Sequence, residues 1–254
     1  MEDIRSAVFN YSPKMTHKPE ISIIIPCLNE EQNIPQLVAK LDTLLKHHNL
    51  FAEVLIVDDC SDDYTFRESF IMQEDFPFVR ALHKGLPRGI GNAIKYGIEH
   101  AQGKMGVVVM GDLVDPLEAI VDFREKIINQ GYKLALLSRY LVPEDHANIP
   151  FSYKFYQWWY RFLCRTLLGI KVKDITYAFR AFDLDWVKGL GLESGGFEIS
   201  PEITIKTHLR RGGICEIKGR QGRRVEGESK FLFSKEGLGY ARVLLKGIFL
   251  RNKF

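Results

Sequence analysis

The chain has 254 residues, of which 46% are hydrophobic and 26% charged, so it is long enough to bury a large core in one α/β domain. Its net charge of +3 at pH 7 gives no overall field that would favour nucleic acid as a partner. No apolar run is long enough to span a membrane, and the polar first twenty residues do not resemble a signal peptide. The four cysteines lack the spacing of a metal site. We therefore expect a cytoplasmic protein with reduced cysteines.

Residues 1–20 are expected to form an irregular lead-in to one domain that covers residues 21–233. In the first half of that domain, short apolar runs alternate with stretches of helical periodicity. Strands are predicted at 21–26, 52–57, 78–82, 107–110 and 134–137. Four helices are predicted: one that begins at about residue 30, one that includes residue 70, one at 92–101 and one at 117–129. Because strands that alternate with helices pair in parallel, the pattern predicts an α/β fold with a mostly parallel sheet and helices on both faces.

Polar residues follow the first two predicted strands. Residues 26–30 can hold a base or a ribose, and Asp58 and Asp59 can accept hydrogen bonds from a base edge or from ribose hydroxyls. The structural alternatives are a helix N-cap at Asn29 and a turn at residues 62–63. Each cluster alone favours its structural alternative, but both should lie on the sheet edge where open α/β sheets bind ligands, and together with Asp112 they favour a nucleotide site.

A third polar cluster follows the strand at 107–110 and contains Asp112 and Asp115. Two carboxylates, completed by phosphate oxygens and water, suit a hard divalent cation such as Mg²⁺ or Mn²⁺. The structural alternative is that both residues cap a helix that begins just after Pro116. Residues 83–91 form a glycine-containing loop that lacks the Walker pattern and is either close to the nucleotide or a plain turn.

The second half of the chain is richer in aromatic and basic residues. Residues 151–169 combine aromatic rings with lysine and arginine, which is typical of an interfacial helix at a membrane surface. Residues 234–254 are expected to form a C-terminal amphipathic helix with basic residues beside an apolar stripe. For both segments the alternative is a core helix with a solvated face. We also expect a strand at 174–182, a helix at 198–210, a strand at 214–217 and a basic loop at 219–230.

Taken in order, these motifs resemble glycosyltransferase family 2. The first half carries the resemblance through Ile-Ile-Ile-Pro-Cys-Leu-Asn-Glu-Glu (23–31), Val-Asp-Asp-Cys-Ser-Asp-Asp (57–63), Gly-Ile-Gly-Asn-Ala (89–93) and Gly-Asp-Leu-Val-Asp-Pro (111–116). The second half resembles the polyprenyl (dolichol) phosphate sugar synthases through Ser-Arg-Tyr (138–140), Asp-Ile-Thr (174–176), Phe-Arg (179–180), Gly-Phe-Glu (196–198) and Gly-Glu-Ser-Lys (227–230).

The resemblance implies a GT-A (nucleotide-sugar, Rossmann-like) fold and an inverting transfer of a hexose from a GDP- or UDP-sugar to polyprenyl phosphate, dolichyl or undecaprenyl, at the cytoplasmic face of a membrane. The protein would bind peripherally to the membrane surface or to an integral membrane partner. The implied nucleotide-lining residues are Pro26, Leu28, Glu30, Val57 and Asp59. Gly111 and Asp112 would meet the diphosphate and metal, and Arg139, Arg224 and Lys230 would meet phosphates. Asp112, Arg224 and Lys230 would carry the catalysis, because a departing diphosphate needs cationic groups nearby.

One stretch departs from the family pattern. The synthases usually carry Asp-Ala-Asp here, whereas this chain has Met110 two residues before Asp112 and the apolar Val114 two residues after it. Only Asp112 matches the family's metal ligand directly, and Asp115 is expected to supply the second carboxylate at a new spacing. Two other hypotheses stay open: a family 2 enzyme that acts on a sugar hydroxyl in cell-surface polysaccharide or glycolipid synthesis, and an inactive homologue that binds a nucleotide-sugar.

Overall fold

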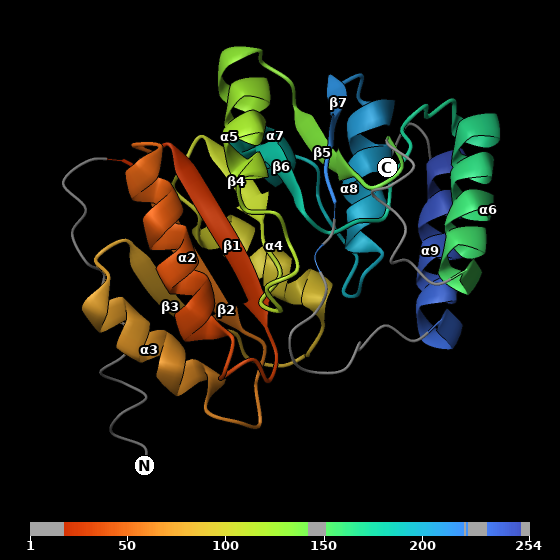
Figure 1. Cartoon of the computed structure of the whole chain (residues 1–254). Helices are drawn as coiled ribbons and strands as arrows, with labels where there is room; N and C mark the ends of the chain where they lie inside the picture. Colours follow the sequence, from red (N-terminus) through yellow and green to blue (C-terminus); the bar gives the residue numbers. More distant parts are fainter. Residues whose placement is uncertain (1–17, 142–150, 221, 223–232, 250–254) are drawn as a thin grey trace.

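The computed structural model describes residues 18–141, 151–220, 222 and 233–249 (Figure 1). These residues form a seven-stranded sheet in the order β3-β2-β1-β4-β6-β5-β7. The strand β6 runs antiparallel to β4 and β5, and the other neighbouring strands pair in parallel. The strands are β1 (Ile21–Cys27), β2 (Ala52–Asp58), β3 (Val79–His83), β4 (Met105–Val108), β5 (Leu134–Ser138), β6 (Arg180–Asp183) and β7 (Ile214–Lys218). The prediction of a mostly parallel α/β sheet is confirmed.

Helices cover both faces of this sheet, which is also as predicted. They are α2 (Ile34–His47), α3 (Thr65–Asp75), α4 (Ile90–His100), α5 (Ala119–Arg124), the π-helical turn η1 (Glu125–Asn129), α6 (Phe151–Leu168), α7 (Leu184–Lys188), α8 (Ile199–Leu209) and α9 (Phe233–Phe249). On one face, α2, α5 and η1 share a core cluster with Ile23 and Ile25 of β1. On the other face, α4, α7 and α8 pack around Ile24. Because β1 is covered on both sides, its apolar run is continuous rather than alternating.

The helices α6 and α9 form a separate pair beyond α8 (Figure 1). Their shared core contains Tyr160, Cys164 and Leu168 from α6, and Tyr240 and Val243 from α9. Ile205 of α8 belongs to the same cluster. This pair therefore attaches to the sheet domain through α8, whose other residues Ile199 and Ile203 pack against the sheet.

The observed elements depart from the predicted ones in several places. The strand expected at 174–182 begins only at Arg180, because the residues before it are held by side-chain hydrogen bonds instead of a ladder. The helix expected at 117–129 begins at Ala119 and ends as the π-helical turn η1. The short helix α7 was not predicted. The predicted lead-in at 1–20 and the end of the predicted C-terminal helix lie mostly outside the described residues.

Candidate functional site

The polar clusters predicted from the sequence meet at one edge of the sheet. Strand β1 pairs in parallel with β2 on one side and with β4 on the other, so the carboxyl ends of all three strands lie together. Cys27 is in register with Asp58, and Ile24 is in register with Val108. The loops after these strands are therefore neighbours, as expected of a ligand-binding edge.

The loop after β1 is bonded to the loop after β2. The Asn29 N–H donates to Ser61 Oγ at 3.0 Å, and the Asp62 N–H donates to Asn29 Oδ1 at 2.8 Å. The Glu30 N–H donates to Thr65 Oγ1 at 2.7 Å. Asn29 has a φ of 56°, a left-handed conformation that asparagine tolerates better than most residues. The alternative of a helix N-cap at Asn29 is wrong, because α2 begins at Ile34.

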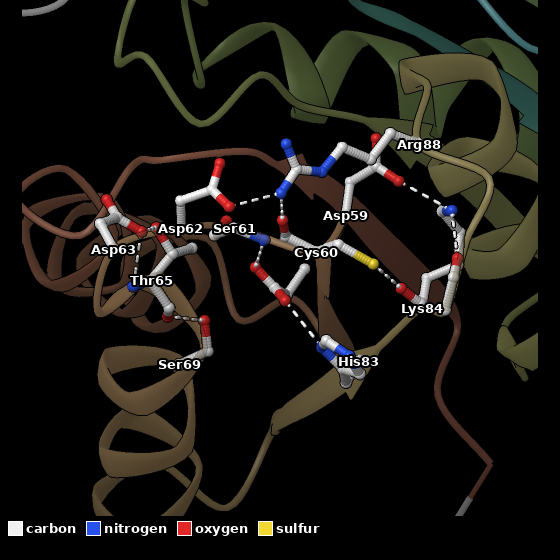
Figure 2. Close-up of polar contacts among 12 residues, drawn as sticks. Asp59, Cys60, Ser61, Asp62, Asp63, Thr65, Ser69, His83, Lys84 and Arg88 are labelled. Atoms are coloured by element: carbon white, nitrogen blue, oxygen red, sulfur yellow. Dashed lines mark hydrogen bonds and ion pairs between the residues drawn. The ribbon is translucent and has the colours of Figure 1, made fainter.

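Asp59 joins the end of β2 to the glycine-containing loop (Figure 2). Asp59 is 3% exposed, and its Oδ1 lies 2.8 Å from Lys84 Nζ. The Gly89 N–H donates to Asp59 Oδ2 at 2.6 Å. Lys84 Nζ also donates to the carbonyl oxygens of Gly85 and Pro87 at 2.8 and 2.6 Å. The loop at 83–91 therefore lies beside the predicted nucleotide residues, and Asp59 shapes it.

The neighbouring Asp58 is likewise held by the protein. Its Oδ2 lies 2.8 Å from Nδ1 of His83, and its Oδ1 accepts from the Ser61 N–H at 3.2 Å. Arg88 adds a second connection, since its Nη2 donates to the Cys60 carbonyl at 2.5 Å and to Asp62 Oδ1 at 2.6 Å. The hydrogen bond from Arg88 lowers the pKa of Asp62. This pair is exposed to solvent, so its contribution to stability is small.

The loop after β4 is closed by Asp115. The Met110 N–H donates to Asp115 Oδ2 at 2.7 Å, and the Tyr177 hydroxyl donates to Asp115 Oδ1 at 2.6 Å. Asp112 and Asp115 are both buried, at 6% and 7% exposed. Burial raises the pKa of Asp115 to about 7, against the lowering effect of its two hydrogen bonds. A side chain at Gly111 would approach Glu30 Cγ to 3.3 Å, so the loop lies directly beside the loop after β1.

Arg139, at the end of β5, reaches the same region through Tyr177. Its Nε and Nη2 donate to the two carboxylate oxygens of Asp174 at 2.7 and 3.1 Å, which is a bidentate pair. The Arg139 guanidinium lies 4.2 Å from the centre of the Tyr177 ring. Arg180, 1% exposed, donates from Nε to the Tyr177 carbonyl at 3.1 Å and from Nη1 to the Ser200 carbonyl at 2.5 Å.

Most of the predicted site residues are brought to this edge of the sheet, although their roles stay predictions. Pro26, Leu28, Glu30 and Asp59 lie at the ends of β1 and β2, Gly111, Asp112 and Asp115 in the loop after β4, and Arg139 after β5. Val57 is fully buried in the core cluster with Ile24, so only its backbone can line a ligand. Arg224 and Lys230 lie outside the described residues. The Gly222 N–H donates to the Val114 carbonyl at 2.8 Å, so Gly222 lies beside the loop after β4.

The sequence did not single out Lys84, Arg88 or Tyr177. Lys84 and Arg88 were visible only as members of a glycine-containing loop with a weak pattern. Tyr177 lies between two motifs of the family resemblance, at 174–176 and 179–180. This position was the only feature of the sequence that could have pointed to a role for Tyr177 in the site. No periodicity reveals that it contacts Asp115, which lies 62 residues earlier.

The carboxylates allow a test of the predicted metal site. Among the described residues, no group of three or more histidine, cysteine, aspartate and glutamate side chains could hold an ion. Asp112 and Asp115 are the two carboxylates of this loop, and each oxygen of Asp115 accepts one hydrogen bond. Mg²⁺ commonly binds through one or two carboxylates together with substrate phosphates and water. The residues therefore fit an ion that is shared with a diphosphate better than a preformed protein site.

The helix pair α6 and α9 exposes an apolar surface. On α6, the side chains of Phe155, Trp158, Trp159 and Phe162 are 43–56% exposed. On α9, Leu245 and Phe249 are 51% and 76% exposed. We call the four aromatic residues of α6 the aromatic face. In the part of the chain that the structure describes, no helix is both long and apolar enough to cross a bilayer.

Comparison with known proteins gives the family and the fold. The model of the family described as "Glycosyl transferase family 2" matches residues 22–191. A dolichol-phosphate mannosyltransferase of Pyrococcus furiosus is 32% identical over 214 residues, which cover 83% of this chain but only 59% of that protein. An undecaprenyl-phosphate mannosyltransferase of Micrococcus luteus is 27% identical over 214 residues, which cover 82% of this chain and 85% of that protein.

A solved structure resembles the whole arrangement. Glucosyl-3-phosphoglycerate synthase of Mycobacterium tuberculosis, in complex with Mn²⁺, UDP and glucosyl-3-phosphoglycerate, superposes with a TM-score of 0.66 over 92% of this chain and 80% of that chain. The sequence identity is 17%, so this likeness shows the fold alone. The fold is GT-A, as predicted from the sequence.

Proposed function

Because the chain belongs to glycosyltransferase family 2, we propose that it transfers a hexose from a GDP- or UDP-sugar to a polyprenyl phosphate. The transfer would invert the configuration at the anomeric carbon. The chain would act at the cytoplasmic face of a membrane, bound peripherally to the lipid surface or to an integral membrane partner. The names of the relatives in Pyrococcus furiosus and Micrococcus luteus support the choice of acceptor.

The aromatic face of α6 is the observation that carries this acceptor. Tryptophan and phenylalanine side chains favour the headgroup region of a bilayer, where apolar rings and polar groups meet. The bases Lys154, Arg161 and Arg165 lie on the same helix, where they can approach lipid phosphates. A water-soluble acceptor would give no reason to expose four large rings on one helix.

The proposed donor site lies at the ends of β1, β2 and β4. The nucleoside would occupy the region of Pro26, Leu28, Glu30 and Asp59, with the diphosphate near Gly111 and Asp112. Mg²⁺ or Mn²⁺, held by Asp112 and the diphosphate, would neutralise charge on the leaving group when bound. Arg139 is a buried cation in the same region, and its carboxylate partner Asp174 fixes its orientation.

The reaction requires little proton chemistry. An oxygen of the lipid phosphate attacks the anomeric carbon from the side opposite the diphosphate, and the bond to the diphosphate oxygen breaks as the new bond forms. The acceptor is already an anion, so no general base is needed. The negative charge that develops on the nucleoside diphosphate must instead be stabilised by cations, for which Arg139, Arg224 and Lys230 are the candidates.

A partition assay tests this proposal. The protein is incubated separately with labelled GDP-mannose, UDP-glucose and UDP-N-acetylglucosamine, together with polyprenyl phosphate and Mg²⁺ or Mn²⁺. We expect label to enter the organic phase with one of these donors, and the product to be cleaved by mild acid, as a sugar phosphodiester is. The Arg139→Met variant should lose most of this transfer.

Two outcomes would contradict the proposal. Transfer to a glycan hydroxyl, giving a product that resists mild acid, would identify the chain as a family 2 enzyme of polysaccharide or glycolipid synthesis. Nucleotide binding without transfer to any acceptor would identify an inactive homologue. The inactive homologue is included because Met110 and Val114 depart from the family's Asp-Ala-Asp pattern.

A further inference from the structure

The start of helix α4 is held by a backbone segment that lies much later in the chain. The N–H groups of Gly91 and Asn92 donate to the Gly195 carbonyl at 2.9 and 3.2 Å. A β-carbon at Gly91 would lie 2.7 Å from the Gly195 carbonyl carbon, and one at Gly89 would overlap the Gly195 oxygen. The glycines of the 83–91 loop therefore allow two backbones to meet. Two of the first N–H groups of α4, which a phosphate could otherwise have used, are bonded to the protein.

A buried carboxylate fixes the segment that carries Gly195. Glu202 of α8 is 1% exposed, and its two oxygens accept from the N–H groups of Glu193 and Ser194 at 2.9 and 2.8 Å. Its Oε1 also lies 2.8 Å from Nζ of Lys206, which is 2% exposed. Hydrogen bonds to an ionised group are stronger than those between neutral groups. Glu202 therefore sets where the 193–196 segment presents the Gly195 carbonyl.

On its other side, the start of α4 contacts a predicted nucleotide residue. The Gly89 N–H donates to Asp59 Oδ2 at 2.6 Å, and Asp59 Oδ1 lies 2.8 Å from Lys84 Nζ. An ionised carboxylate has about four lone-pair sites, so each oxygen of Asp59 can still accept a further hydrogen bond from a nucleoside. Gly89 thus lies between the Gly195 carbonyl and the Asp59 carboxylate, and a shift on one side is passed to the other.

We propose that Glu202 is a positioning residue of the donor site. It fixes the 193–196 segment, whose Gly195 carbonyl holds the start of α4. This contact places Gly89 so that its N–H orients the Asp59 carboxylate toward the nucleoside. Of these residues, Asp59 alone would touch the nucleotide. The inference rests on the proposed donor site, and it does not depend on the acceptor.

Equilibrium binding of GDP and UDP to the whole chain, measured by calorimetry with Mg²⁺ present, tests this proposal without any turnover. Gly91→Ala places a β-carbon against the 193–196 segment, while alanine itself favours helix α4. We expect the dissociation constant of the nucleotide to rise about 10–100-fold, the cost of misplacing one hydrogen bond to a charged group. Glu202→Gln keeps one acceptor oxygen and replaces the other with a donor, so the rise should be about 3–10-fold.

A matched control and a double variant separate positioning from a general loss of stability. Lys95 also links α4 to this segment, but its Nζ donates to the Glu193 carbonyl at 3.2 Å in an exposed contact. Lys95→Met should therefore leave the dissociation constant within about twofold. Asp59→Asn should weaken nucleotide binding. Adding Gly91→Ala to it should then change the affinity by less than about threefold, because both changes act on the same hydrogen bond.

Several results would overturn the proposal. Unchanged nucleotide affinity in Gly91→Ala and Glu202→Gln, with circular dichroism showing both folded, would make the contact purely structural. If Gly91→Ala does not fold, Glu202→Gln decides alone. Additive losses in the double variant would mean that Gly91 does not act through Asp59, and a loss in Lys95→Met as large as in Gly91→Ala would also contradict the proposal. If neither nucleotide binds the unmodified chain, the proposed donor site itself is wrong, which differs from every result above.

Discussion

The buried carboxyl of Asp115 should make the stability of this protein depend on pH in an unusual direction. Its pKa is raised from 3.8 to about 7 in the folded state, chiefly because burial disfavours the charged form. In the unfolded chain the carboxyl is exposed and ionises near its ordinary pKa. Between these two values the unfolded chain has lost the proton and the folded chain keeps it, so unfolding releases a proton. Raising the pH through this window therefore favours unfolding.

The magnitude follows from the shift. A shift of about three pKa units at about 1.4 kcal/mol per unit corresponds to about 4 kcal/mol. This contribution is fully favourable below pH 4, is lost progressively as the pH rises to about 7, and is constant above that. The Asp115→Asn variant has no titrating carboxyl here. Relative to the unmodified protein, its free energy of unfolding should therefore rise by about 4 kcal/mol between pH 4 and pH 8.

Urea unfolding followed by circular dichroism measures this difference. Both proteins are unfolded at a series of pH values in the presence of a chelator, so that no bound ion affects the titration. Subtracting the two curves cancels the other ionisable groups, which are the same in both chains. A difference that stays constant within 1 kcal/mol from pH 4 to pH 8, or that falls as pH rises, would refute the reasoning.

Three further predictions concern stability. Arg180→Met removes the donor to the carbonyls of Tyr177 and Ser200. Since each buried acceptor left unsatisfied costs about 1–3 kcal/mol, the free energy of unfolding in urea should fall by about 2–6 kcal/mol, whereas a loss below about 1 kcal/mol would mean that water replaces the guanidinium. Glu202 is 1% exposed and its carboxylate lies 2.8 Å from Lys206 Nζ, so Lys206→Met leaves a buried carboxylate without its cation. This variant should lower the free energy of unfolding by about 3–5 kcal/mol, and adding Glu202→Leu should restore part of the loss. Gly97→Ala introduces a carbon that would lie 2.4 Å from Ile24 Cγ2, so α4 must shift and we expect a loss of about 1–3 kcal/mol in thermal unfolding, opposite in sign to the helix propensity of alanine.

The sequence was most informative where the fold depends on periodicity. The strands of the first half were predicted to within two residues, because apolar runs and helical stripes alternate without interruption from Ile21 to Ser138. The meeting of polar residues at one edge followed from the parallel pairing. The same argument could not find the residues that hold these polar groups in place, since Lys84 and Arg88 carry no pattern of their own.

The stretch before β6 shows why the remainder could not be predicted. Residues 174–182 contain alternating apolar positions and were expected to form one strand. Side-chain hydrogen bonds fix the backbone here instead of a strand ladder. Arg180 donates to three carbonyl oxygens, and Asp174 accepts from Arg139. Such networks depend on which side chains meet in three dimensions. The hydrogen bond from Tyr177 to Asp115 could not be predicted for the same reason, because the sequence shows both residue types but not that they meet.

The helix α8 has a consequence for how the proposed enzyme would stand on a membrane. Every residue from Ile199 to Thr207 is buried, with the α6–α9 pair on one side and the sheet on the other. Glu202 accepts from the N–H groups of Glu193 and Ser194, and the Gly195 carbonyl next to them accepts from the N–H of Gly91 at the start of α4. If the aromatic face lies on the bilayer, the height and tilt of the donor site above the lipid headgroups are then built into the fold. Under the proposed function, the lipid phosphate would then have to reach a sugar that is held at this fixed height.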